Sequence, residues 1–97
     1  MKALSENEVT AFLSEKLTGW AFEGEFLIRD FKFKTFVDAF SFMTAVAIEA
    51  EKMDHHPDWS NVYNRVVIKL NTHDASGITS MDLRLAQTID RLFSIHS

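Results

Sequence analysis

The chain has 97 residues, 46% of them hydrophobic, which fits one domain over residues 1–97 with a sizeable core and excludes a disordered protein. Its formal net charge of −4 leaves no basic surface for phosphate groups, which argues against nucleic acids and acidic membranes as partners. No cysteine and no long apolar run occur, which excludes disulfides, thiolate nucleophiles, a signal segment and a membrane span, and fits a cytoplasmic protein.

A helix is predicted near the start of the chain. Ser5 and Glu8 have the spacing of a capping box, in which each side chain bonds to the backbone N–H of the other residue. Apolar residues then recur at helical intervals from Val9 to Leu17, and Gly19 ends the pattern. These residues make one apolar stripe, so one face of the helix is expected to meet the core.

A β-hairpin is predicted next. The apolar segments Trp20 to Phe22 and Phe26 to Lys34 flank the turn-like triplet Glu23-Gly24-Glu25. The second segment alternates, with one side formed by Leu27, Phe31 and Phe33 and the other by Asp30, Lys32 and Lys34. The first side is expected to face the core and the second to face water.

A long helix follows, from the Thr35 and Asp38 capping pair to about Met53, with Pro57 shortly beyond. One apolar stripe of this helix comprises Phe36, Phe40, Met43 and Ala47. Further apolar surface, more than a helix lying on one sheet needs, comes from Val37, Phe42, Val46 and Ile48. Two explanations are open: a deeply buried helix or a contact between copies of the chain.

Strand-like alternation returns from Asn61 to Thr72, and Asn64-Arg65 is a point where it can divide into two strands. One side comprises Val62, Val66, Ile68 and Leu70, and the other Tyr63, Arg65, Lys69, Asn71 and His73. A last helix is predicted after Gly77, with Thr79 and Asp82 at capping-box spacing. Its core stripe is expected to be Met81, Leu85, Ile89 and Leu92.

The order of these elements is α-β-β-α-β(β)-α. Adjacent hairpins and helices able to cover one face indicate an α+β fold on an antiparallel sheet. The chain contains neither a glycine-rich phosphate loop nor a Gly-x-Ser-x-Gly elbow, which argues against a doubly wound nucleotide-binding fold.

Histidines are the residues most able to do chemistry. His55 and His56 are adjacent after the long helix, where a solvated or capping role and a functional role are equally open. His73, in a second polar loop, favours function, because imidazoles with a pKa of about 6.5 can donate and accept protons near neutral pH. A zinc site with Asp74 is less favoured, since adjacent rings rarely point at one ion and no His-Glu-x-x-His motif occurs.

The same residues belong to a longer pattern, Glu51-x3-His55-His56-Pro57-x5-Tyr63-x9-His73-x8-Asp82. This pattern resembles the signature of the pterin-4a-carbinolamine dehydratases, and the resemblance extends from the Trp20 hairpin through the last helix. It implies a four-stranded antiparallel sheet with three helices on one face. It also implies the dehydration of a 4a-hydroxytetrahydropterin, left by an aromatic amino acid hydroxylase, to the quinonoid dihydropterin. The pterin is then the substrate, and neither cofactor nor metal is implied.

The resemblance implies a role for each site residue. His55, His56 and His73 are the catalytic set, with acid and base unassigned. Residues implied to hold the pterin are Asp54, Trp59, Asn71, Thr72 and Asp74, although for Trp59 a structural role as a core or loop anchor is favoured over a contact with the pterin. Glu51 and Asp82 are expected to support the histidines, and Asp82 also suits the start of a helix.

Family members are dimers or tetramers, so a homo-oligomer is implied as well. Animal members also serve as dimerisation cofactors for a homeodomain transcription factor and carry a cysteine where this chain has Ala75, so that second role is not implied here. Two alternatives remain: an interaction module that stabilises a partner's oligomer through the apolar long helix, and a metal-dependent hydrolase. Three imidazoles favour the dehydratase, because an interaction surface has no need of them.

Overall fold

The computed structural model describes residues 2–96, which form three α-helices and four strands. In chain order the elements are α1 (Glu6–Lys16), β1 (Ala21–Glu23), β2 (Phe26–Lys32), α2 (Phe36–Met53), β3 (Asp58–Val62), β4 (Arg65–Leu70), the short 3₁₀ helix η1 (His73–Ala75) and α3 (Ser80–His96). The predicted α+β class and element order are confirmed. None of the helices in this part of the chain is both long and apolar enough to cross a membrane.

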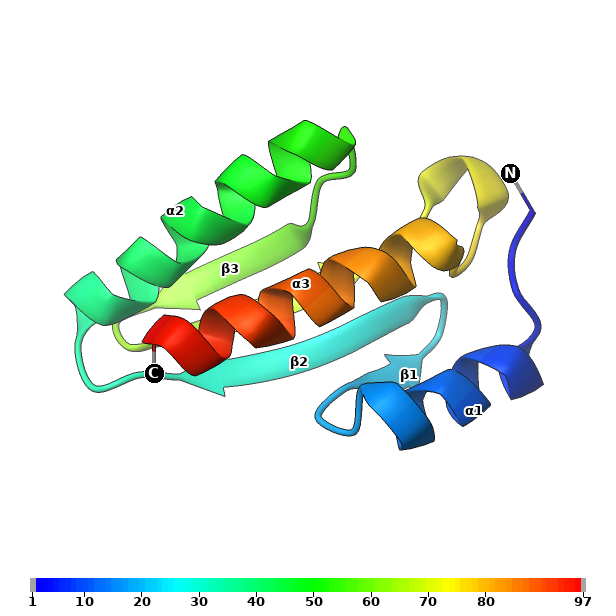
Figure 1. Cartoon of the computed structure of the whole chain (residues 1–97), viewed down its shortest axis with the longest axis horizontal. Coiled ribbons are helices and arrows are strands. Elements are labelled where there is room, and N and C mark those ends of the chain that lie inside the picture. The colour runs from blue at the N-terminus through cyan, green and yellow to red at the C-terminus, as the bar shows by residue number, and fades with distance from the viewer. Residues whose placement is uncertain (1, 97) are drawn as a thin grey trace.

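The four strands form one antiparallel sheet in the order β1-β2-β4-β3. The central pair is β2 with β4, in register from Leu27 opposite Leu70 to Lys32 opposite Arg65. Figure 1 shows α2 and α3 side by side across one face of this sheet, with α1 beside β1. The helices therefore cover one face, as the resemblance implied.

The helices begin where side chains satisfy their first free N–H groups. At α1 the predicted capping box is complete: Glu8 N–H donates to Ser5 Oγ (3.1 Å) and Ser5 N–H donates to Glu8 Oε1 (2.9 Å). At α2 the N–H of Asp38 donates to Thr35 Oγ1 (3.1 Å). At α3 the N–H of Thr79 donates to Asp82 Oδ2 (2.9 Å). All three predicted helix starts are confirmed.

An aromatic cluster fills the core between the sheet and the two long helices. Phe31 of β2 lies 5.1 Å from Phe42 of α2 and 4.9 Å from Phe93 of α3, measured between ring centroids. Phe33, just past the end of β2, packs on the same two rings. The inward side predicted for this strand is confirmed, since Leu27, Phe31 and Phe33 are all buried.

The interpretation of α2 needs correction. Its buried face is formed by Ala39, Phe42, Val46 and Ala50. Phe36 and Phe40, in the first stripe named above, are 47% and 56% exposed, and Ile48 is 53% exposed, so deep burial within the chain is wrong. Apolar residues occur on more than one side of this helix, and periodicity alone cannot say which side the sheet covers.

The third strand also differs from the prediction, because β3 begins at Asp58 and not near Asn61. Val62 pairs with Arg65 and is 76% exposed, so it does not share the core side of Val66. The chain reverses between β3 and β4 at Tyr63, whose φ is 52°, and the reversal breaks the alternation assumed for a continuous segment.

Candidate active site

A cavity of about 300 Å³ lies where the end of α2 meets the loop after β4. Its lining comes from two segments, and the residues are Asp54, His55, His56, Asn71, Thr72, His73 and Asp74. In Figure 1 the end of α2 and the loop containing η1 lie at the same end of the molecule. All three histidines of the predicted catalytic set therefore line one cavity, together with four of the five residues expected to hold a ligand.

The backbone after α2 separates the two adjacent histidines. Asp54 adopts a left-handed conformation (φ 52°), which aspartate tolerates better than most residues. The N–H of His55 then donates to Ala50 O (3.1 Å), which closes the end of the helix. The His55 side chain is only 11% exposed, whereas that of His56 is 57% exposed, so one turn places two imidazoles in different surroundings.

The ring of His55 is hydrogen-bonded to a buried carboxylate that does not line the cavity. Its Nε2 lies 2.6 Å from Oδ1 of Asp82, which is fully buried in the first turn of α3. A short bond between an imidazole and a carboxylate fixes the orientation of the ring. Asp82 itself is absent from the cavity lining, as expected for a residue that supports a histidine.

The second oxygen of Asp82 is also engaged. Oδ2 accepts bonds from the N–H of Thr79 (2.9 Å) and from the hydroxyl of Thr72 (2.7 Å). The hydroxyls of Thr72 and Thr79 lie 2.7 Å apart. Although Thr72 lines the cavity, its hydroxyl is thus directed at the carboxylate behind His55.

The other two histidines are more open to solvent. His56 Nε2 lies 2.9 Å from Oε1 of Glu51, and both side chains are exposed. His73 lies at the start of η1 and is exposed. The cavity wall therefore combines imidazoles, the carboxylates of Asp54 and Asp74 and an amide, groups that together can transfer protons and bind the polar edge of a ligand. Within residues 2–96, no group of three or more His, Cys, Asp or Glu side chains is arranged to hold a metal ion.

Trp59 lies apart from this set. It occupies β3 opposite Ile68 and packs against the core, and it does not line the cavity. Its predicted contact with a ligand stays a prediction. Tyr63, another signature position, lies in the turn after β3.

Thr79 also belongs to the hydrogen-bond network of the site, a role that its sequence position at the start of a helix does not predict. The signal was present, because its capping-box spacing to Asp82 places both residues at one helix end. That spacing does not show that the same carboxylate also reaches His55, which is 27 residues away in the chain.

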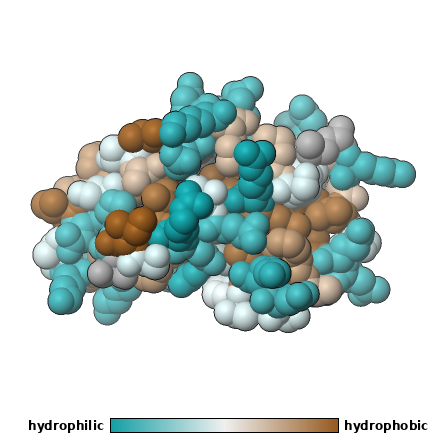
Figure 2. All heavy atoms as spheres, in the orientation of Figure 1, coloured by the Kyte–Doolittle hydropathy of each residue, from teal (hydrophilic) through white to brown (hydrophobic). Residues whose placement is uncertain are grey.

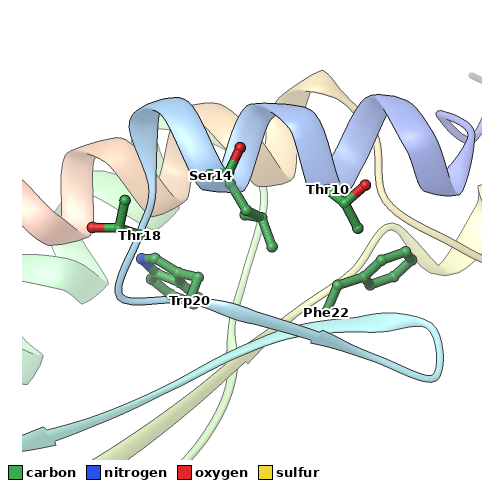
Figure 3. Close-up of a pocket in the computed structure, with 6 residues that line it drawn as sticks. Thr10, Ser14, Thr18, Trp20 and Phe22 are labelled. Carbon is green, nitrogen blue, oxygen red and sulfur yellow. The ribbon is translucent and has the colours of Figure 1, made fainter.

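A larger hollow of about 450 Å³ lies elsewhere, between α1 and β1. Its lining comprises Thr10, Leu13, Ser14, Thr18, Trp20 and Phe22. Figure 3 shows the rings of Trp20 and Phe22 on the face of the strand segment that is turned toward α1. No titratable side chain lines it, and the hydroxyls of Thr10 and Ser14 donate to carbonyls of their own helix. The groove has volume but no group for proton transfer, so the smaller cavity is the candidate active site.

Comparison with known proteins gives one consistent family. The family model described as "Pterin 4 alpha carbinolamine dehydratase" matches residues 2–92. A Mesorhizobium japonicum protein named "Putative pterin-4-alpha-carbinolamine dehydratase" is 52% identical over 92 residues, which cover 93% of each chain. A Prochlorococcus marinus protein of the same name is 45% identical, over 94% of this chain and 95% of its own.

Solved structures show the same fold. The crystal structure of a transcriptional coactivator/pterin dehydratase from Brucella melitensis is similar with a TM-score of 0.88 and 41% identity, covering 94% of this chain and 98% of its own. A pterin dehydratase-like protein identified as a RuBisCO assembly factor in the alpha-carboxysome has a TM-score of 0.64 at 20% identity, over 76% of this chain and 86% of its own. At that identity the likeness concerns the fold alone.

Proposed function

Because the chain belongs to the pterin-4-alpha-carbinolamine dehydratase family, we propose that it is a hydro-lyase that converts a 4a-hydroxytetrahydropterin into the quinonoid dihydropterin and water. The observation that carries this proposal is the cavity lined by His55, His56 and His73, with the His55 ring bonded to a buried carboxylate.

The chemistry needs two proton transfers. The hydroxyl on C4a must receive a proton to leave as water, and N5 must lose one as its lone pair forms the C=N bond. Two imidazoles in different protonation states can perform both steps near neutral pH. His55 supplies one ring, and the more exposed His56 or His73 supplies the other. The assignment of acid and base among them stays open.

Substrate binding is proposed for the polar wall. A pterin presents alternating donors and acceptors on its pyrimidine edge, which suit the carboxylates of Asp54 and Asp74 and the amide of Asn71. The volume of about 300 Å³ is at the lower end of the range for small-molecule sites. A bicyclic ring therefore suits this cavity better than a large ligand does.

The proposed context follows from the reaction. The quinonoid product is an oxidised pterin that can be reduced and used again. The enzyme would therefore support pterin recycling for an aromatic amino acid hydroxylase in the cytoplasm. The pterin is the substrate, and no resident cofactor or metal is part of the proposal. Nucleic acid and membrane partners are left out as well, since the net charge is −4.

The decisive test is to add purified protein to a chemically generated 4a-hydroxypterin and to follow its decay. Faster decay than in buffer is expected, and it should survive exhaustive treatment with EDTA, because proton transfer by imidazoles requires no Lewis acid. Unchanged decay would contradict the proposed reaction. Activity lost with EDTA and restored by zinc would instead support a metal-dependent mechanism.

A second candidate is an interaction module that stabilises a partner's oligomer. The observation in its favour is the exposed apolar surface of α2, formed by Phe36, Val37, Phe40 and Ile48. Figure 2 shows hydrophobic surface among the polar patches on the helix side, including the end where α2 begins. A protein that binds a partner but leaves the decay of the hydroxypterin unchanged would favour this function.

A further inference from the structure

Hydrogen bonding around Asp82 runs in one direction. A hydroxyl has a single proton to donate, and that of Thr72 is directed at Asp82 Oδ2 (2.7 Å). The 2.7 Å contact between the two threonine hydroxyls therefore requires the proton of Thr79. The oxygen of Thr79 in turn accepts the N–H of Met81 (3.3 Å). The chain of donors thus runs from Met81 through Thr79 and Thr72 to Asp82.

Asp82 is the end point of this chain. Its Oδ2 also accepts the N–H of Thr79 (2.9 Å), and the residue lies in the first turn of α3, where the helix dipole favours a negative charge. The backbone N–H donor at Oδ2 and the helix dipole both favour the ionised carboxylate, which accepts hydrogen bonds at both oxygens. The short bond from Oδ1 to His55 Nε2 (2.6 Å) then requires that Nε2 carry the proton.

The other ring nitrogen of His55 is thereby left available. Within residues 2–96, Nδ1 makes no hydrogen bond, and no buried side-chain nitrogen or oxygen lacks a partner. Nδ1 must therefore be accessible, and His55 lines the cavity.

We propose that Thr72 and Thr79 are positioning residues, which hold Asp82 as a proton acceptor and thereby fix His55 in the Nε2–H tautomer. Nδ1 is then the atom that exchanges a proton with the substrate. Thr72 acts through Asp82, and its hydroxyl does not bind the pterin. The statement about the substrate rests on the proposed function, whereas the statement about the tautomer does not.

The tautomer is measured by NMR of the ¹⁵N-labelled imidazoles, with the four histidines assigned from single alanine variants. In the unmodified protein, His55 should appear as the Nε2–H tautomer. Thr72→Ser keeps the hydroxyl and should preserve this signal, whereas Thr72→Val should weaken it. Thr79→Val should have a smaller effect, because the bond from Thr72 to Asp82 remains. Thr44→Val is the matched control, since that hydroxyl donates only to Phe40 O of its own helix.

Kinetics distinguish positioning from substrate binding. Thr72→Val should lower kcat about tenfold, the scale seen when a partner that orients a histidine is removed, while KM barely changes and Thr72→Ser retains activity. A raised KM with an unchanged His55 spectrum would show that Thr72 binds the substrate directly and would overturn the proposal.

The proposal can fail even if Thr72→Val does not fold. A His55 ring found as the Nδ1–H tautomer in the unmodified protein overturns it without any variant. Conversely, a protein without dehydratase activity whose Nε2–H signal still depends on the Thr72 hydroxyl supports the positioning role and contradicts the proposed function alone.

Discussion

The adjacency of His55 and His56 has a structural explanation at the residue scale. The left-handed Asp54 ends α2, after which His55 turns inward to Asp82 and His56 turns outward to Glu51. A single turn thus supplies one imidazole with a buried carboxylate partner and one that is exchangeable with solvent. Proton transfer in two directions benefits from such a difference between rings.

Alanine at each histidine of the site should therefore impair catalysis. His55→Ala, His56→Ala and His73→Ala are each expected to lower kcat by about 10²–10⁴, because each removes an imidazole from the set that lines the cavity and can transfer a proton. Pterin affinity should fall less. The double variant of His55 and His56 should be little worse than the worse single variant, since losing either the acid or the base breaks the same path. Steady-state kinetics and equilibrium binding measure both effects.

His96→Ala is the control for this series. That ring caps the end of α3 by bonding to Leu92 O (2.9 Å) and does not line the cavity. The kcat of His96→Ala should match that of the unmodified protein, and circular dichroism should confirm that the variant is folded. If the three site variants also kept their kcat while folded, the histidines would be structural and the proposed reaction would be wrong.

At the scale of elements, the start of α1 depends on a reciprocal pair. The backbone N–H and then the hydroxyl of Ser5 bond to Glu8 and lower the pKa of that carboxyl from its ordinary value of 4.5. A carboxyl with a lowered pKa in the folded state stabilises the fold above its unfolded pKa, and the contribution is lost as the pH falls through the folded pKa.

Glu8→Gln should test this contribution. The variant keeps an acceptor but not the charge, so its melting temperature should be below that of the unmodified protein at neutral pH. The difference should shrink as the pH falls below 4.5, the ordinary pKa of glutamate, and through the lowered pKa of Glu8 in the folded protein, because Glu8 itself becomes protonated. Thermal unfolding across this range measures it. A difference that stays constant with pH would mean that the charge of Glu8 does not contribute.

A second element-scale feature joins the loop after α1 to β2 and α3. Arg29 of β2 donates to Asp90 Oδ1 (2.8 Å) and lies over the ring of Phe31, 4.5 Å from its centroid. Trp20 Nε1 donates to the same oxygen (2.8 Å). A Cβ added at Gly19 would lie 2.7 Å from Arg29 Cζ, so the guanidinium, which is bonded to Asp90, must shift to make room for it.

Gly19→Ala should therefore destabilise the fold by about 1 kcal/mol, the lower end of the cost of overpacking, because the guanidinium can shift only at the expense of its bond to Asp90. Chemical denaturation measures the change. The matched control is the double variant Gly19→Ala, Arg29→Met, in which the added methyl group should cost much less because the guanidinium is gone. An unchanged stability of Gly19→Ala alone would show that Arg29 moves aside freely.

At the scale of the whole molecule, two apolar surfaces are open to solvent. One is the exposed side of α2, with Val37 at 69% exposure, and the other is the edge of the sheet at β3, where Val62 is 76% exposed. Exposed apolar surface and an open strand edge are both typical of contacts between subunits. We expect a homo-oligomer, a dimer or tetramer, in which one or both of these surfaces form the contact between subunits.

Light scattering at micromolar concentration should find more than one chain per particle. Phe40→Glu should reduce the size of the particle if α2 forms the contact, and Val62→Lys should do so if the β3 edge forms it, because each places a charge in a dry interface. Circular dichroism should stay unchanged, as both positions are exposed within the chain. A monomer in the unmodified protein would count against the prediction.

The single domain expected over residues 1–97 stays a prediction as well.

Interactions between residues close together in the chain make the helix starts, the strand alternation and the family of this protein predictable from its sequence. The caps at Ser5 and Thr35 and the alternation along β2 involve residues a few positions apart, so they are readable in sequence order. The signature from Glu51 to Asp82 similarly identified the family, because its spacing is a property of the chain itself.

Only the tertiary structure decided which groups meet. Which side of α2 is buried depends on the sheet beneath it, and the side that Val62 faces depends on its pairing with Arg65. The bond between His55 and Asp82 and the bond between Thr72 and Asp82 join segments that sequence spacing cannot place at hydrogen-bond distance. Such contacts arise when distant segments pack together, and their geometry is set by the fold of the whole chain rather than by any one stretch of it.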